Sequence, residues 1–307
     1  NLTTISDGIS AEVIRKTPDR NTGDVLKRVS GVSITDNKFA VIRGLADRYN
    51  LAMLNGDILP SSESDRKAFS FDIFPAALLD NIVIVKAATP DRPAEFAGGI
   101  IDLSTKEIPV ESFLNIQLGC GMNTISTFKS YYDSKNSKTD WLGYDKTLRV
   151  IPSGFPDRNQ LNLTNTVAQN VQAAKTMQNT WGTEQKASMT PFRNAQLSAG
   201  WLKKFKSGGA FGVIGALTYN RNTRNYFIER NEIVGADEAY AYKDTATRDN
   251  VLIGSMLNVG LKINNRNKIS LRNSFTLNAE DQTVRRQGNS MDNEYLLKGS
   301  ALWFTNN

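Results

Sequence analysis

The sequence contains no histidine among its 307 residues, and its only cysteine is Cys120. The absence of histidine excludes imidazole-based acid–base catalysis and histidine-ligated metal sites within this chain. A single cysteine cannot form an internal disulfide, so the cysteine content does not indicate a cellular compartment. The chain also lacks an apolar run of ~18 residues, which a membrane-spanning helix needs. None of these three absences excludes a protein that crosses a membrane with β-strands.

The composition is that of a folded protein, with 40% hydrophobic and 22% charged residues. The net charge of +6 is compatible with nucleic-acid binding, but Lys and Arg are scattered through predicted loops and turns instead of forming one basic run. We therefore expect no nucleic-acid partner. The mean hydropathy of −0.38 does not exclude the membrane, because a barrel strand needs only ~9–11 alternating residues.

The N-terminal part, residues 1–109, has the pattern of a compact mixed α/β domain. The sequence predicts a helix over 11–16 after Ser10, and a second helix that begins at Thr22 and ends before Gly31. Short strands are predicted at Val32–Ile34, Phe39–Ile42, Ala52–Leu54, Ile82–Val85 and Ile100–Ser104.

From Phe113 onward, apolar and polar residues alternate in longer runs. In one of them Leu257 and Val259 share a face, while Asn258 and Gly260 share the other. Such runs predict antiparallel strands with one apolar face, long enough to cross a bilayer when tilted. The runs begin at Phe113 and recur at Ala195–Phe205, Ala210–Asn220, Leu252–Ile263, Lys268–Asn278 and Tyr295–Phe304.

The predicted connections between these strands alternate in length. Residues 206–209 and 264–267 are tight turns, whereas residues 123–194, 221–251 and 279–294 are predicted to be long, polar and irregular. Short turns at one end and long loops at the other are typical of outer-membrane barrels. A soluble sandwich shares the alternation but rarely has such a long loop after its first strand, so the pattern favours a barrel.

Six strands cannot close a barrel around a folded domain of this size, because plugged transporters have roughly 22 strands. We therefore expect a barrel that is incomplete within these residues. Asn1 does not begin a signal peptide, so the leader of an exported protein would have been removed or would lie outside this chain.

Four motifs in the first half occur in a specific order and spacing. They are Asp24–Val32, then Phe39–Leu45, then Ala52–Gly56 with Ile58-Leu59-Pro60, and finally Ile82–Lys86 with Pro90, Glu95-Phe96, Gly98–Ile101 and Thr105-Lys106. This order resembles the plug domain of TonB-dependent outer-membrane receptors. Segment Asp140–Asp145 is similar to a first-loop segment of those receptors that carry a regulatory-type domain ahead of the plug.

The resemblance implies a plug domain at 1–109 and the first part of an outer-membrane β-barrel at 110–307, in a Gram-negative bacterium. The implied function is active uptake of a scarce nutrient, which could be a siderophore, vitamin, glycan or peptide. TonB, with ExbB and ExbD, would act from the periplasmic side, and outer-membrane lipid would surround the barrel. No cofactor or metal is implied.

Two alternatives remain open. The same scaffold could be a closed platform for surface lipoproteins or for a secretion or adhesion assembly. It could also be a soluble α/β domain fused to a β-sandwich binding module. Catalysis is not expected, because carboxylate pairs such as Asp133/Asp140 lie in loops without oxyanion or metal-binding patterns, and Cys120 has no histidine to activate it.

The resemblance also implies roles for individual residues. Arg43 and Lys86, with Glu95, would take part in gating between plug and barrel, although Lys86 stands where the family usually has arginine. Alternatively, Arg43 could pair within the plug. Backbone geometry is the expected role of Gly44, Asn55, Gly56, Gly98 and Gly99. Substrate contacts are expected from Asp47, Arg48, Tyr49, Asn50, Ser61, Ser62, Glu63, Asp65 and Arg66.

The long segment 123–194 is rich in aromatic residues and leaves two interpretations open. It could supply stacking surfaces for a carbohydrate or planar ligand, or it could fold over the barrel mouth as structure. The aromatic residues in question are Tyr131, Tyr132, Trp141, Tyr144 and Trp181.

Overall fold

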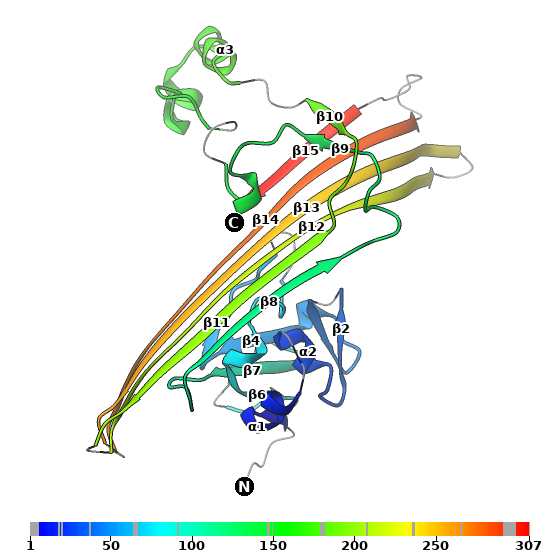
Figure 1. The fold of residues 1–307 in the computed structure, drawn as a ribbon. Helices are drawn as coiled ribbons and strands as arrows, with labels where there is room; N and C mark the ends of the chain where they lie inside the picture. The colour runs from blue at the N-terminus through cyan, green and yellow to red at the C-terminus, as the bar shows by residue number, and fades with distance from the viewer. Residues whose placement is uncertain are drawn as a thin grey trace.

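A small mixed α/β domain lies against one side of a tall, curved antiparallel sheet, which we call the wall (Figure 1). The computed structural model describes residues 6–306 apart from 18, 20, 37, 64–66, 91, 146–147, 149, 179–181, 207, 235–236, 265 and 291–298. Among the residues so described, no helix is both long and apolar enough to cross a membrane.

The N-terminal domain is built on a five-stranded sheet of order β1-β6-β7-β4-β5. Only the β4–β7 pair is parallel. The strands are β1 (Ser6–Ser10), β4 (Asn50–Leu54), β5 (Asp57–Ile58), β6 (Leu79–Val85) and β7 (Gly99–Thr105). A separate hairpin consists of β2 (Val32–Thr35) and β3 (Phe39–Ile42). All five predicted strands are present, and β1 and β5 are additional.

The helices of this domain are short. They are α1 (Ala11–Lys16), α2 (Thr22–Leu26), and the 3₁₀ turns η1 (Asp47–Tyr49) and η2 (Ala76–Leu78). The cap of α2 lies one residue earlier than predicted, because the Asn21 side chain accepts a hydrogen bond from the Asp24 N–H. Val25 and Leu26 of this helix are fully buried and fix it over the sheet.

The core of the N-terminal domain continues into the wall. Ile82, Ile84 and Leu103 of the central strands are fully buried. They belong to the same apolar cluster as Ile214 and Leu252, which lie on wall strands. The domain is therefore packed against the wall by apolar contact as well as by the polar contacts described below.

The wall is a six-stranded antiparallel sheet of order β15-β14-β13-β12-β11-β8. Its strands are β8 (Phe113–Gly121), β11 (Phe192–Lys204), β12 (Ala210–Val234), β13 (Asp237–Lys262), β14 (Lys268–Ser290) and β15 (Gly299–Asn306). The fold class predicted from the sequence, a mixed α/β domain followed by long antiparallel strands, is confirmed.

Side chains of the wall strands point alternately to the two faces of the sheet. On β12, β13 and β14 the even-numbered residues face the N-terminal domain, and Asn220 and Asn258 there are 6% and 1% exposed. The odd-numbered residues face away, and the apolar Leu217, Leu257 and Phe275 are 49%, 49% and 59% exposed. We call these the inner and outer faces. The outer face thus carries an apolar band, as the alternation predicts.

The predicted loops at 221–251 and 279–294 are wrong for most of their length. Strands β12 and β13 continue through them in unbroken register, apart from a bulge near Glu232, and β14 continues to Ser290. The apolar band ends near Tyr219, and beyond it cross-strand ion pairs such as Arg221–Asp249 (2.6 Å) support the sheet. Because these pairs replace apolar residues, the sequence no longer shows a strand-like alternation.

The connection from β8 to β11, predicted to be irregular, contains short elements. They are β9 (Tyr131–Ser134), η3 (Asp140–Leu142), a π-helical turn η4 (Gln160–Thr164), α3 (Val167–Lys175) and β10 (Thr183–Lys186). Strands β9 and β10 pair with each other, and a capping box between Thr166 and Gln169 begins α3.

The apolar band predicts a position-dependent effect of charge. In the full-length protein with its natural flanks, Leu257→Lys should lower the free energy of unfolding from lipid vesicles by about 2–4 kcal/mol, the cost of a lysine near the bilayer midplane. Urea titration of refolded protein measures this. Asn231→Lys, on the same face but beyond the band, is the control and should change it by less than about 1 kcal/mol. Equal losses for both variants would contradict a lipid-facing band.

Candidate functional site

The boundary between the N-terminal domain and the wall is the candidate functional site, because it joins the two parts of the chain. In its upper part, inner-face amides contact the N-terminal domain. Asn278 donates to the Ser62 carbonyl at 2.7 Å, Asn220 donates to Asp72 at 3.3 Å, and Lys38 donates to Asn250 at 3.4 Å. Each strand from β12 to β14 thus supplies one amide to this boundary.

Asp72 is a titratable group within these contacts. Burial raises the pKa of its carboxyl above the ordinary aspartate value. Lys38 and hydrogen bonds from Ser70 and Asn220 act in the opposite direction and do not cancel the effect of burial. Protonation of Asp72 is therefore easier where the domain meets the wall than it is for a solvent-exposed aspartate.

In its lower part, the boundary is formed by the segment that leads from β7 into β8. Asn258 donates to the Thr105 hydroxyl at 3.0 Å and to the Lys106 carbonyl at 2.9 Å. The carboxylate of Glu107 pairs with Lys268 and Arg272 of β14. Four polar contacts thus hold the end of the N-terminal domain to the wall.

Glycines on the inner face leave room for two isoleucines of the N-terminal side. Gly212 and Gly260 are cross-strand partners, and a Cβ on either would lie 2.7 Å or 2.6 Å from the Ile108 side chain. A Cβ on Gly254 would lie 2.9 Å from Ile73. Such distances are too short for any side chain, so these glycines form two notches that receive Ile108 and Ile73.

The residues predicted to act in gating make contacts inside the N-terminal domain. Arg43 donates to the Lys86 carbonyl at 3.0 Å. Lys86 is 10% exposed in its side chain and binds Asp7 of β1 at 2.5 Å and the Ser30 carbonyl at 2.8 Å. Glu95 pairs with Lys67 at 3.3 Å on the surface. Contacts between these residues and further barrel strands stay a prediction.

The residues predicted to serve backbone geometry occupy two kinds of position. Gly44, Asn55 and Gly56 have φ values of 77°, 54° and 97°, in the region that favours glycine and asparagine. The Asn55-Gly56 pair forms the β4–β5 hairpin. A Cβ on Gly98 would lie 2.1 Å from the Asn50 side chain, and a Cβ on Gly99 would lie 3.1 Å from Ile42.

The first group of predicted substrate residues surrounds η1. Arg48 donates to the Tyr49 hydroxyl at 2.7 Å and lies over its ring at 4.7 Å. Asp47 accepts from the Arg48 backbone N–H at 2.9 Å. Asn50 points inward, since its amide nitrogen donates to the Ala40 carbonyl at 2.9 Å. Arg48 and Tyr49 are exposed and can meet a ligand, whereas Asn50 connects the strands beneath them.

The described members of the second group, Ser61, Ser62 and Glu63, lie beside the wall. Ser61 accepts from the Ala68 N–H at 3.1 Å, and Ser62 accepts from the Ser70 N–H at 2.9 Å, so both hydroxyls hold the loop together. Glu63 contacts Asn278 at 3.2 Å. Asp65 and Arg66 lie outside the described residues.

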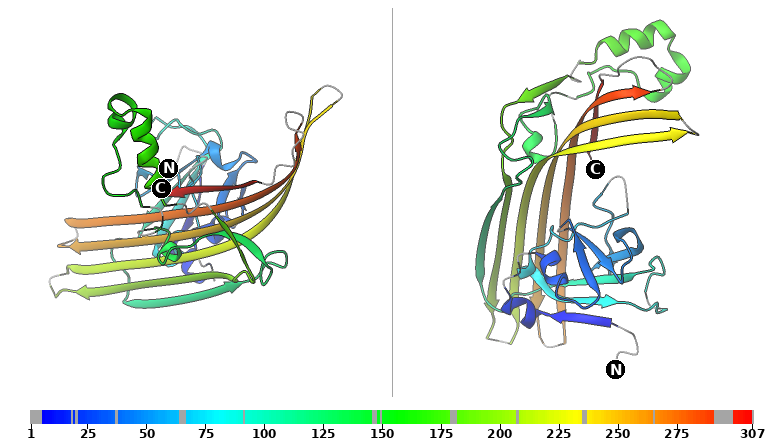
Figure 2. Two further views of the ribbon diagram at one scale, coloured as in Figure 1. Left: turned by 90° about the horizontal axis from the view of Figure 1, so that it is seen from above. Right: turned by 90° about the vertical axis from the view of Figure 1, so that its right-hand side faces the viewer.

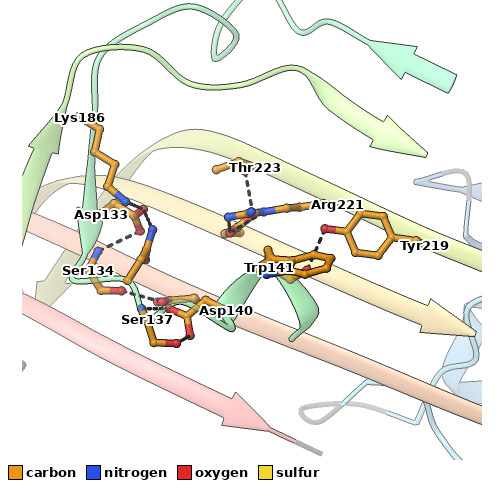
Figure 3. Close-up of polar contacts among 12 residues, drawn as sticks. Asp133, Ser134, Ser137, Asp140, Trp141, Lys186, Tyr219, Arg221 and Thr223 are labelled. Carbon is orange, nitrogen blue, oxygen red and sulfur yellow. Dashed lines mark hydrogen bonds and ion pairs between the residues drawn. The ribbon is translucent and has the colours of Figure 1, made fainter. Parts of the chain in front are cut away.

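The aromatic segment between β8 and β11 docks on the outer face of the wall, away from the N-terminal domain (Figures 2 and 3). Tyr219 donates to the Trp141 carbonyl at 2.8 Å, and a Cβ on Gly143 would lie 3.0 Å from Ala279. Arg285 lies over the Tyr132 ring at 4.5 Å. All these wall residues are odd-numbered, so Trp141 and Tyr132 are not placed to stack with a ligand on the inner face.

Polar contacts fix this segment to the wall above the apolar band. Ser134 donates to Asp281 at 2.7 Å, and Lys186 binds the buried Asp133 at 2.6 Å (Figure 3). Burial, with smaller contributions from the Asp133 and Asp249 charges, raises the pKa of Tyr131 to about 12. Tyr131 therefore stays neutral at physiological pH. Trp181 lies outside the described residues.

Sequence analysis missed a polar and aromatic cluster on the inner face of the strand extensions. Asp244 is fully buried and binds Arg286 at 2.8 Å and Arg230 at 3.1 Å. Tyr242 lies under Arg286 and stacks on Tyr240, with ring centroids 4.8 Å apart. Tyr240, Tyr242 and Asp244 are two residues apart in sequence, which would place them on one face of a strand. This signal was not used, because residues 221–251 were predicted to be a loop.

Comparison with known proteins assigns the N-terminal domain. Residues 1–100 match the family model described as the TonB-dependent Receptor Plug Domain. No curated protein matches. The chain is similar in structure to the siderophore receptor PirA of Pseudomonas aeruginosa, with 14% identity, a TM-score of 0.35, and coverage of 97% of this chain and 42% of that one.

Two further solved structures show similarity of the same kind. The outer-membrane transporter YddB of Escherichia coli has 12% identity and a TM-score of 0.38, with 93% and 37% coverage of the two chains. The ferric citrate transporter FecA has 11% identity and a TM-score of 0.39, with 97% and 51% coverage. The chain therefore spans about half or less of the length of each, and the assignment rests on the plug family.

The matched family consists of receptor domains of the Gram-negative outer membrane, which are not enzymes. The apolar outer face and polar inner face of the wall agree with this location. Residues 1–100 therefore match a TonB-dependent receptor plug domain, and a wall of long antiparallel strands follows them.

Proposed function

We propose that this chain supplies the gate and the first part of the wall of a receptor for TonB-dependent active uptake of a scarce nutrient. The observation that carries the proposal is the polar boundary between plug and wall. Asn220, Asn258 and Asn278 each hold the plug by side-chain hydrogen bonds. The nutrient could be a siderophore, vitamin, glycan or peptide.

A boundary of this kind can open and close. A hydrogen bond contributes only about 0.5–1.5 kcal/mol net, because water replaces the lost partner when the surfaces separate. The amide groups of Asn220 and Asn278 and the carbonyl of Ser62 can all be hydrated once exposed. An entirely apolar boundary would expose apolar surface to water during each cycle, at about 25 cal/mol per Å². The observed contacts therefore suit a domain that has to move.

The N-terminal strand is a suitable point for a pulling partner. Strand β1 pairs only with β6 among the described strands, at the edge of the plug sheet. Lys86 adds a contact to Asp7 in the same strand. Tension applied upstream of β1 would load this contact first and then reach Arg43 through the Lys86 carbonyl. We include Arg43, Lys86 and Glu95 as gating residues in the proposal.

Further parts of the proposal concern boundaries and partners. The plug would comprise residues 1–109 and the barrel would begin at residue 110. TonB, with ExbB and ExbD, would supply the energy from the periplasmic side. The similarity of Asp140–Asp145 to receptors with a regulatory-type domain ahead of the plug supports placing this chain in that group. The similar structures include a siderophore receptor and a ferric citrate transporter, and we extend the proposal to a small-molecule substrate on that basis.

Uptake can be tested directly against the second candidate, a closed platform for surface lipoproteins or a secretion or adhesion assembly. A strain lacking the full-length gene should fail to grow when one particular nutrient is scarce, and growth should return with the gene only when TonB is present. Normal growth of the deletion strain on every scarce nutrient, together with loss of a surface lipoprotein, would instead support the platform.

Filling a glycine notch should loosen the plug. Gly260→Val forces a side chain against Ile108 and the Glu107 carbonyl, and overpacking of this kind costs typically about 1–3 kcal/mol. Cells that produce the full-length variant should become more sensitive to a large hydrophilic antibiotic, because a displaced plug leaves the barrel open. Gly215→Val is the matched control, since a Cβ there meets nothing closer than 3.7 Å. Equal sensitivity of both variants would contradict the notch.

The contact between Asp72 and the wall should depend on pH. Because its pKa is raised in the docked plug, the contact is most stable below the ordinary aspartate pKa of about 3.9 and weakens as pH rises through the raised value. Hydrogen exchange of the segment around Asp72 in the full-length receptor measures the opening free energy. Asp72→Asn should abolish this weakening, whereas Asp57→Asn at an exposed position should not. An unchanged pH profile in Asp72→Asn would refute the role of this carboxyl.

A further inference from the structure

The plug touches the wall unevenly. Along β12, β13 and β14 it is held by the amide contacts and glycine notches described above. Opposite β8 and β11, a cavity of about 690 Å³ separates the two parts. Its plug side is formed by α1, η2 and neighbouring loops, and its wall side by Phe113 and by four polar residues, Asn115, Gln117, Gln196 and Ser198.

The four wall residues form two cross-strand pairs, Gln117 with Gln196 and Asn115 with Ser198. Gln196 and Ser198 are only 5% and 4% exposed. Within the described part of the chain, neither side chain has a hydrogen-bond partner. Both residues line the cavity, so water or a solute held there can supply hydrogen-bond partners for their side chains.

The plug side of the cavity carries negative charge. Glu12 is paired with Lys16 at 2.7 Å, and Asp19 is paired with Arg28 at 2.7 Å. The cavity lining also carries the carboxylates of Asp80 and Glu111 and the ammonium of Lys106. Two negative groups against one positive group disfavour an anion in the cavity.

We propose that this cavity binds uncharged, hydroxyl-rich solutes between plug and wall, and that it marks the side on which the passage opens. Amide side chains both donate and accept hydrogen bonds, as hydroxyl groups do, so Gln117, Gln196 and Asn115 match such a solute. This inference rests on the proposed uptake function, since it gives that function a substrate class and a place.

The position of the cavity follows from the contacts that surround it. Opening the plug at β12–β14 would break the contacts of Asn220, Asn258 and Asn278 and empty both glycine notches. Opening it at β8–β11 widens a space that already exists. Of the sides formed by these six strands, the one with fewer contacts needs less work to separate, so on this part of the wall the passage forms there.

Cysteine labelling of the purified full-length receptor tests the site without requiring transport. In a Cys120→Ser background, Gln196→Cys places a thiol at the cavity and Thr218→Cys places one on the inner face at the tightly held side. Thr218 is 1% exposed and does not line the cavity, so it is a control of matched burial. The reagents are the uncharged N-(2-hydroxyethyl)maleimide and the anionic 3-maleimidopropionate.

The uncharged reagent should label the Gln196→Cys variant at least about tenfold faster than the Thr218→Cys variant, because the latter thiol reacts only after local opening. It should also label the Gln196→Cys variant several-fold faster than the anionic reagent does. Replacing both acids, as Asp80→Asn with Glu111→Gln, should remove that preference. Equal labelling of the two cysteine variants, or no charge preference, would overturn the proposal.

In cells, Gln196→Trp should fill the cavity and reduce uptake at least about tenfold, whereas Leu197→Trp, whose side chain lies on the outer face, should not. If labelling is as expected but the wild type shows no TonB-dependent uptake, the proposed function is rejected and the cavity site is retained. If labelling is as expected but Gln196→Trp leaves uptake unchanged, the inference that the passage opens at this cavity is rejected.

Discussion

The two-residue alternation of the wall strands is the constraint on which the rest of this structure depends. A strand places successive side chains on opposite faces, so each residue of the wall belongs either to the lipid or to the plug. Leu257 and Asn258 are neighbours in sequence, yet one lies on the apolar outer face and the other binds the plug. A shift of register by a single residue would exchange the two environments along the whole strand.

This constraint explains why small and amide residues dominate the inner face. A folded plug needs room beside a flat sheet, and glycines such as Gly254 and Gly260 provide it where isoleucines of the plug side approach. Between the notches, Asn258 and Asn278 donate to backbone carbonyls of the plug, and Asn220 donates to the Asp72 carboxyl. The resulting boundary combines a small apolar contact through Ile73 and Leu252 with separable hydrogen bonds.

Much of the fold could be predicted from residues 1–121, because their local signals agree with the tertiary structure. Asn55-Gly56 indicated its hairpin, and the run Ile82–Val85 indicated a buried strand. The extended strands could not be predicted, since beyond Tyr219 charged residues such as Arg221 and Asp249 interrupt the apolar–polar alternation that identifies a strand. Docking of Trp141 on the outer face depends on contacts between segments far apart in sequence, such as Ser134 with Asp281, which no local pattern reveals.

The outer-face docking of the β8–β11 segment changes which residues can meet a solute. Its aromatic side chains cover the outside of the strand extensions, so selectivity on this part of the wall has to come from inner-face residues. Tyr240 and Tyr242 lie on that face, braced by Arg286 and Asp244. Under the proposed uptake function, a ligand that enters along the inner face would meet these rings. The extended strands thus serve two purposes, because their outer face anchors a long segment while their inner face remains available above the plug.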